Sequence, residues 1–282
     1  VEYIESRNDL KKPFFLYVPL GSPHTPIVPT PEWEGKSGLG LYGDFVMQTE
    51  NVVGEIQKAL TEIGQVGNTL IIFTSDNGCS KAAGIGELAK QGHIVSADLR
   101  GSKADLWDGG HRIPFIVKWP GKVKPGSESD QLICLTDLFA TMTDLLGQKA
   151  LENGAEDSVS FLPALYGKKI VSTRKGVIHH SISGHFAYRQ GPWKLLLAKA
   201  SGGWTSPREK QAPAGSPPGQ LYNMSTDLGE KKNLFKEKPE MVASLLALLE
   251  KDIERGRSTK GPKSKNDLND IKIWKSGQPK KK

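Results

Sequence analysis

Apolar positions in the first half of the chain alternate between runs typical of strands and a spacing typical of a helix. Residues 13–20, 69–75 and 113–119 are largely apolar, which predicts strands buried in a sheet. Residues 44–64 place apolar side chains at helical spacing, with Asp44 as the expected N-cap. Because this helix separates the first two strands, we expect a βαβ unit in which those strands are parallel.

The second half of the chain predicts a smaller antiparallel sheet covered by one helix. Residues 136–146 and 239–255 carry apolar side chains at helical spacing, so both segments are expected to be helices. The polar segment 148–158 marks the expected seam between two domains. The strand-like runs are residues 176–181, 186–189 and 193–197.

These patterns predict the α/β fold class with three parts. Residues 1–150 form the main α/β domain, residues 151–255 a smaller α+β subdomain, and residues 256–282 a basic tail. The tail has nine basic and two acidic residues, so it carries the whole net charge of +7, and the remaining 29 basic and 29 acidic residues cancel. The body therefore gives no indication of a nucleic-acid surface. The tail is either a solvated segment or a polyanion-binding site.

Length, hydropathy and cysteine content exclude several classes. No apolar stretch approaches the roughly 20 residues that span a bilayer. The first residues lack the basic start and apolar core of a signal peptide. Because the chain begins with Val1 instead of Met, we expect a segment of a longer protein. Cys79 and Cys134 are too few for a disulfide framework and are expected to be buried or incidental.

The strand predicted at residues 69–75 ends in Ser75-Asp76-Asn77-Gly78. Ligands bind outside the carboxyl ends of strands in an open α/β sheet, so Asp76 and Asn77 are expected at a functional rim. Their adjacent side-chain oxygens suit a hard cation such as calcium or magnesium. The alternative is a simple turn, because these residue types dominate turns.

Two further positions are candidates for chemistry. His24 lies in a proline-rich loop that follows the strand predicted at residues 13–20, and the prolines fix where its imidazole points. Lys103 follows Gly101-Ser102 after a long aperiodic segment, and its point charge suits a sulfate or phosphate oxygen. The alternative for both is an ordinary exposed side chain.

The motifs, taken together and in this order, resemble the sulfatases, which hydrolyse sulfate esters and belong to the alkaline-phosphatase-like superfamily. One position departs from the family pattern, since Asp108 stands where the family usually has Glu. The matching stretches are Pro23-His24-Thr25-Pro26, Ser75-Asp76-Asn77-Gly78, Gly101-Ser102-Lys103, the segment 108–114, Trp193-Lys194-Leu195, Leu221-Tyr222-Asn223 and Gly229-Glu230.

The resemblance implies roles for the matched residues. Asp76 and Asn77 are expected to be ligands of a divalent cation, usually calcium, with magnesium as an alternative. Lys103 and His24 are expected to be catalytic and to hold the sulfate group, with His24 also assisting the leaving oxygen. Arg112 is expected to be structural.

The resemblance also implies a fold, a substrate class and a location. The fold is expected to be a partial alkaline-phosphatase-like sheet with flanking helices, followed by the smaller α+β subdomain. The substrate is expected to be a sulfated small molecule or glycan, and the protein secreted or periplasmic. His179 and His180, with His185 and Trp204, are candidates for contacting the organic part of the substrate. A metal cluster of the three histidines is the alternative.

The family nucleophile is a formylglycine made from Cys or Ser in a Cys/Ser-x-Pro/Ala-x-Arg motif. Neither Cys79 nor Cys134 lies in such a motif, and no serine of the chain does. We therefore expect the nucleophile upstream, in a protein of which this chain is the C-terminal portion, and no activity from this chain alone. Two alternatives stay open: a phosphatase or phosphodiesterase of the same superfamily, and an inactive truncated chain that binds polyanions through its tail.

Overall fold

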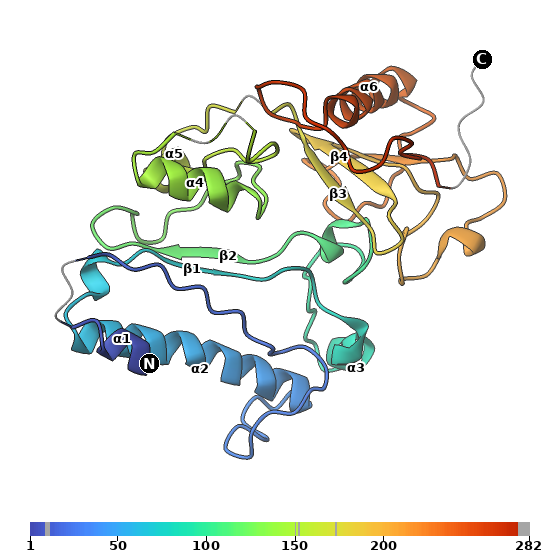
Figure 1. Cartoon of the computed structure of the whole chain (residues 1–282). Coiled ribbons are helices and arrows are strands. Elements are labelled where there is room, and N and C mark those ends of the chain that lie inside the picture. The colour runs from blue at the N-terminus through green and yellow to red at the C-terminus, as the bar shows by residue number, and fades with distance from the viewer. Residues whose placement is uncertain (9–11, 150, 152, 173, 276–282) are drawn as a thin grey trace. The chain divides into compact units, whose positions relative to one another are not determined.

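The computed structural model describes residues 1–8, 12–149, 151, 153–172 and 174–275, which form two compact units (Figure 1). Unit 1 comprises Val1–Thr74, Cys79–Ala97 and Phe115–Pro125, and unit 2 comprises Ser75–Gly78, Asp98–Pro114 and the chain from Gly126 onward. Each unit is thus assembled from segments that are distant in sequence. The predicted division into residues 1–150, 151–255 and 256–282 stays a prediction.

Unit 1 is built on the long helix α2 (Gly40–Glu62). Its buried face carries Ala59 and Leu60, which form a core with Ile4 of the short helix α1 (Glu2–Glu5). Each of these three side chains is 1% exposed, because the helical spacing of α2 gathers its apolar residues on one side.

The helix α2 starts earlier than the sequence predicts, so the assignment of Asp44 as N-cap is wrong. Asp44 is buried within the first turns, and its carboxylate accepts hydrogen bonds from the amides of Gly35 (2.9 Å) and Ser37 (2.8 Å). A carboxylate suits both the predicted N-cap role and the observed role, because in each it accepts hydrogen bonds from backbone N–H groups near the start of a helix. Here it fixes the loop that leads into α2.

The strand β1 (Ile71–Thr74) pairs antiparallel with β2 (Phe115–Lys118), and the two lie side by side in Figure 1. Residues 13–20 form no strand, so the predicted parallel βαβ unit is wrong. Phe15 and Tyr17 in that segment are each 76% exposed. Apolar composition predicted a strand there, but composition does not specify a hydrogen-bonding partner.

Unit 2 contains the antiparallel sheet and packed helix that the sequence predicts. Its strands follow one another in the order β3-β4-β5-β6, and all neighbours are antiparallel. The prediction lacked only β6, which follows a segment rich in Gly, Pro and Ser. The strands are β3 (Val177–His180), β4 (Phe186–Gln190), β5 (Trp193–Leu196) and β6 (Gln220–Asn223).

The helix α6 (Pro239–Arg255) covers this sheet, as the sequence predicts (Figure 1). Pro239 occupies its first turn, where the missing N–H costs no hydrogen bond, and Gly256 ends it with a φ of 63°. Leu245 and Leu249, which are fully buried, pack with Tyr188 of β4 in the main core. Two antiparallel sheets with flanking helices confirm the mixed α/β class.

Short helices complete the described part of the chain. The predicted helix at residues 136–146 is confirmed as α4. No helix in the described ranges is long and apolar enough to cross a membrane. The α-helices are α3 (Ile85–Lys90), α4 (Asp137–Leu145) and α5 (Leu162–Leu165), and the 3-10 turns are Val66–Asn68, Lys81–Ala83, Asp108–Gly110 and Glu209–Gln211.

The basic tail is not simply solvated. Arg257, Ser258 and Thr259 are buried, and the carboxylate of Asp157 accepts hydrogen bonds from the amide (2.9 Å) and hydroxyl (2.7 Å) of Ser258. Trp274 packs against the main core together with two isoleucines, Ile271 and Ile273. Residues 276–282, which include three of the nine basic residues, lie outside the described residues.

Candidate active site

The Asp76-Asn77-Gly78 turn follows β1 directly, as predicted. Asp76 is exposed and Asn77 is partly buried, so both side-chain oxygens lie near the surface of unit 2. The turn is ordered from within, because the hydroxyl of Ser75 donates a hydrogen bond to the carbonyl of Asn77 (3.0 Å). The turn also bonds to the segment around Gly110, because the amide of Gly78 donates a hydrogen bond to the carbonyl of Gly110 (3.1 Å).

Glycine lets this turn meet the Lys103 loop backbone against backbone. A Cβ on Gly78 would collide with the carbonyl of Gly109. A Cβ on Gly110 would lie 2.6 Å from the carbonyl oxygen of Asp105 and 2.9 Å from that of Ser102. Such distances exclude any side chain, so Gly78 and Gly110 are required by close packing. The candidate metal turn and the candidate sulfate-binding loop are thereby held together in unit 2.

Lys103 lies on a loop that a buried carboxylate holds in place. One oxygen of Asp105 accepts the amide of Ser102 (2.9 Å), and the other accepts the amides of Trp204 and Thr205 (both 2.9 Å). The ammonium of Lys103 forms no ion pair with any residue that the structure describes, and the side chain is only partly buried. A fixed loop with an uncompensated cation is suited to binding an anion.

A fully buried lysine anchors the adjacent Asp108–Gly110 turn. The Nζ of Lys194 on β5 lies 2.6 Å from Oδ1 of Asp108 and 2.8 Å from Oε1 of Glu230. The second oxygen of Glu230 accepts the amide of Asp108 (2.6 Å). Burial alone would raise the pKa of Asp108, but the charges of Lys194 and Arg189 hold it below its usual range. The two carboxylates together compensate Lys194, which has no access to water.

Two histidines pack beneath this turn. The rings of His111 and His179 lie 4.3 Å apart, and Nε2 of His179 is 3.3 Å from the carbonyl oxygen of Leu106. Burial, with a further contribution from Lys194, lowers the pKa of His111 to about 4. Burial also lowers the pKa of His179 well below its usual value. Both imidazoles are therefore neutral at pH 7, and both side chains are only partly buried.

Two further predicted site residues are His180 and His24. His180 is exposed on β3 with its ring against Phe186 (4.2 Å), so it does not join His179. His24 lies in unit 1, where it is exposed and its Nδ1 is 2.9 Å from the carbonyl of Thr25. No three His, Cys, Asp or Glu side chains gather as metal ligands within the described ranges, so the predicted alternative of a histidine cluster is wrong.

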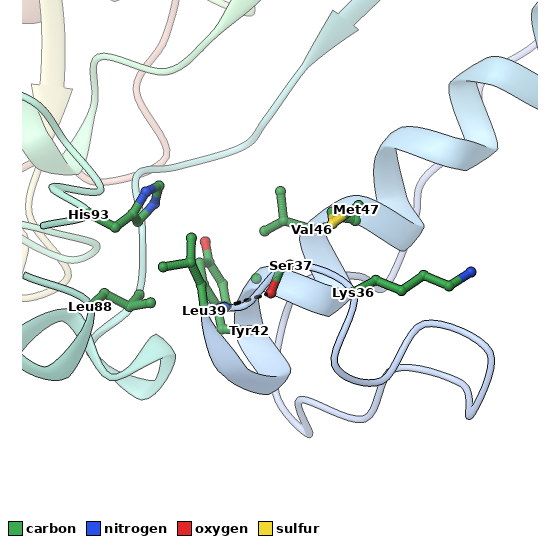
Figure 2. A pocket seen from close by; sticks show the side chains of 9 residues that line it. Lys36, Ser37, Leu39, Tyr42, Val46, Met47, Leu88 and His93 are labelled. Atoms are coloured by element: carbon green, nitrogen blue, oxygen red, sulfur yellow. Dashed lines mark hydrogen bonds between the residues drawn. The ribbon is translucent and has the colours of Figure 1, made fainter. Parts of the chain in front are cut away.

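Unit 1 contains a small cavity of about 260 Å³ beside α2. Figure 2 shows Leu88 and His93 on one side of it and Leu39 and Tyr42 on the other. The thiol of Cys79 donates a hydrogen bond to the Tyr42 hydroxyl (3.3 Å), and burial raises the pKa of this thiol. Cys79 is partly buried, and a protonated thiol is a poor nucleophile.

Several supporting residues were missed by sequence reasoning. Asp105 carried no motif of its own, although it is fully buried and binds three backbone amides. Lys194 and Glu230 stood in recognised motifs, but only the structure shows that they meet across 36 residues of sequence. The sequence contained one signal for the buried ion pair, which is that Lys194 is flanked by apolar residues within a predicted strand.

Comparison with known proteins identifies the class. The sulfatase family model matches residues 1–148, so the chain belongs to the sulfatase family of the alkaline phosphatase superfamily. Over 246 residues the chain is 38% identical to the N-acetylgalactosamine-6-O-sulfatase of Bacteroides thetaiotaomicron, covering 85% of this chain and 47% of that protein. It is 33% identical over 177 residues to the steryl-sulfatase of Rattus norvegicus, covering 62% of this chain and 30% of that protein.

A solved structure agrees with this assignment. It comes from work on the metabolism of multiple glycosaminoglycans by Bacteroides thetaiotaomicron, and it matches with a TM-score of 0.77 and 36% identity. The match covers 89% of this chain and 52% of that one. The matched part of the chain thus spans 47%, 30% and 52% of the length of these three relatives, in the order given.

Replacing Lys194 tests the buried ion network. The Lys194→Met variant removes the only cation paired with Glu230 among the described residues and leaves Asp108 with Arg189 alone, at 3.7 Å. We therefore expect a loss of about 3–5 kcal/mol in the free energy of unfolding, measured by urea denaturation. The matched control is Lys232→Met, because Lys232 pairs with Glu237 at 3.1 Å on the exposed surface. That change should cost at most about 1 kcal/mol. Equal losses in the two variants would contradict the anchoring role of Lys194.

His111 predicts a specific pH dependence of stability. Its pKa is about 4 in the folded protein and about 6.5 when unfolded, so the unfolded state binds a proton first as the pH falls. The contribution of neutral His111 to the free energy of unfolding is complete above pH 6.5 and declines toward pH 4. The decline is about 2 kcal/mol between pH 7 and pH 5. Urea denaturation at pH 7 and pH 5 measures how much free energy of unfolding each protein loses over this interval. The loss in His111→Gln should be smaller than in the unmodified protein by that amount, and equal losses in the two proteins would refute the lowered pKa of His111.

Proposed function

We propose that this chain forms the sulfate-binding part of a sulfuric ester hydrolase that acts on a sulfated carbohydrate. The observation that carries the proposal is the contact of Gly78 with the Gly109-Gly110 backbone. This contact sets two oxygen donors, Asp76 and Asn77, next to the loop of an uncompensated cation, Lys103. Oxygen donors and a lysine in one rigid assembly suit a divalent cation and a sulfate group together.

The donor set fits a hard cation in its chemistry. Asp76 offers a carboxylate and Asn77 an amide oxygen, and calcium prefers oxygen ligands. Calcium, with magnesium as the alternative, would be held by these two residues, and when bound it would offset negative charge on the sulfate oxygens. Calcium usually takes about 6–8 oxygens, so further ligands would come from residues outside this turn.

The roles of the chain's own residues follow from their chemistry. Lys103 would offset charge on the sulfuryl oxygens, because its ammonium has no carboxylate partner in the described part of the chain. His24 would bind the sulfate group and give a proton to the leaving oxygen. His179 and His180 would contact the organic part. We propose that a formylglycine in an upstream segment supplies the nucleophile, since neither Cys79 nor Cys134 lies in the required motif.

A carbohydrate sulfate is favoured by the names of two relatives. One is an N-acetylgalactosamine-6-O-sulfatase, and the 36% identical solved structure comes from work on glycosaminoglycans. We also propose a secreted or periplasmic location, which suits an enzyme that meets extracellular glycans.

Substitution of Lys103 tests its role in the protein that carries this chain with its upstream residues. Lys103→Ala should lower kcat/KM for a 6-sulfated N-acetylhexosamine by about 100-fold or more, because a charge-stabilising contact is lost. The exposed Lys122→Ala serves as the control and should retain full activity. Activity of Lys103→Ala within a factor of two of the unmodified protein would contradict the role. Faster turnover of the corresponding phosphate ester would favour a phosphatase.

The 282-residue chain on its own should not turn over a generic aryl sulfate in the presence of calcium. The reason is that it contains no formylglycine motif, while the proposed mechanism requires that nucleophile. Release of the aryl alcohol is measured by absorbance against a blank that contains calcium alone. Turnover above this blank would show that a residue of this chain is the nucleophile. It would refute the proposal that the nucleophile lies in an upstream segment.

A further inference from the structure

A tight turn with a strained backbone carries Lys103. The amide of Asp105 donates a hydrogen bond to the carbonyl of Ser102 (3.1 Å), which makes Lys103 and Ala104 the two central residues of a four-residue turn. Of these two, only Ala104 has a positive φ, at 83°, as the third residue of a type II turn does. Glycine normally occupies that position, because a Cβ disfavours a positive φ. The turn therefore holds an alanine in a conformation that it would otherwise leave.

The carboxylate of Asp105 keeps this turn closed. One of its oxygens accepts the amide of Ser102 (2.9 Å), so the side chain of the last residue of the turn also bonds to the first. The other oxygen accepts the amides of residues 204 and 205 (both 2.9 Å). Asp105 is 0% exposed and forms no ion pair within the described residues, so backbone N–H groups compensate its charge. Hydrogen bonds to an ionised group are stronger than those between neutral groups, which suits them to holding a strained turn.

The strained residue itself is held by two neighbouring segments. The carbonyl of Ala104 accepts a hydrogen bond from the amide of Ile182 (3.0 Å), in the turn between β3 and β4. The same carbonyl packs so closely on Gly203 that a Cβ there would collide with it. The backbone from which the Lys103 side chain projects is therefore fixed on the side of Ala104 as well as at the two ends of the turn.

We infer that Asp105 is a positioning residue for Lys103, because its carboxylate keeps the strained turn closed and so fixes where the Lys103 ammonium meets the sulfate group. Without that carboxylate, Ala104 relaxes to a negative φ and the Lys103 side chain moves with the backbone. A displacement of about 1 Å in an interacting group can lower a rate by about 100-fold. The inference rests on the proposed function for the role of Lys103. It adds a residue that reaches the reaction only through Lys103.

The first test replaces Asp105 by a residue of the same shape. In Asp105→Asn the side-chain oxygen can still accept the amides of residues 204 and 205, but the NH2 group then faces the amide of Ser102, donor against donor. The variant is made in the protein that carries this chain with its upstream residues. We expect kcat/KM for a 6-sulfated N-acetylhexosamine to fall about tenfold, because the turn opens and Lys103 is displaced.

A double-mutant cycle shows whether Asp105 acts through Lys103. The kcat/KM values of Lys103→Ala, Asp105→Asn and the protein with both changes are compared with that of the unmodified protein. When Lys103 is already absent, Asp105→Asn should lower kcat/KM by less than about twofold, because there is no ammonium left to misplace. A residue that only stabilises the fold would lower kcat/KM by the same factor with and without Lys103.

Relief of the strain provides a rescue experiment. Glycine adopts a φ of 83° without a steric penalty, so adding Ala104→Gly to Asp105→Asn should restore kcat/KM by about threefold or more. The matched control is Asp44→Asn, because Asp44 is 1% exposed and its carboxylate accepts the amides of Gly35 and Ser37 in unit 1. This control should lower the urea midpoint but leave kcat/KM within about twofold. Circular dichroism verifies that each variant is folded.

Three results would overturn the inference: unchanged kcat/KM in folded Asp105→Asn, equal factors with and without Lys103, or no recovery on adding Ala104→Gly. If Asp105→Asn alone does not fold, the protein that also carries Ala104→Gly takes its place in the cycle, with the same expectation. Unchanged kcat/KM in Lys103→Ala would instead refute the proposed function, and the inference with it. That result differs from equal factors, in which Lys103 matters but Asp105 does not act through it.

Discussion

The buried charge of Lys194 is the constraint on which the candidate site depends. An ammonium with no access to water must be compensated, and Asp108 and Glu230 do so at 2.6 and 2.8 Å. Satisfying that charge pins the Asp108–Gly110 turn to the sheet of unit 2. The turn then presents its backbone to Gly78 and to the Lys103 loop. A single strand residue thereby determines where two loops far away in the sequence must lie.

Local elements were predictable where sequence periodicity and end signals agree. The helix α6 has the predicted bounds because Pro239, an apolar stripe and Gly256 all indicate the same segment. The pairing of β1 was not predictable, because an apolar run does not reveal its neighbour. Its partner β2 lies about 40 residues downstream, beyond the long excursion. The segment 13–20 is also apolar, but it forms no strand.

The candidate site was predictable only in the residues that carry motifs. Asp76, Asn77 and Lys103 carry motifs, whereas the groups that hold them depend on long-range contacts such as that of Asp105 with Trp204 and Thr205. Carboxylates of this kind look like ordinary surface residues in a sequence, because burial is a property of the fold. His179 illustrates the same limit, since its position on a strand gave no sign that it would pack on His111.

The contacts that hold the Lys103 loop are made by backbone atoms, and this affects how the sequences of relatives can diverge. The candidate metal turn meets the loop through glycine backbones, and the carboxylate of Asp105 accepts the amides of residues 204 and 205. None of these contacts uses the side chain of Trp204, Arg208 or Lys210. Substitutions of the side chains at Trp204, Arg208 or Lys210 therefore leave these backbone contacts in place. A lineage with this architecture can change these side chains without rebuilding the backbone that positions the Lys103 loop.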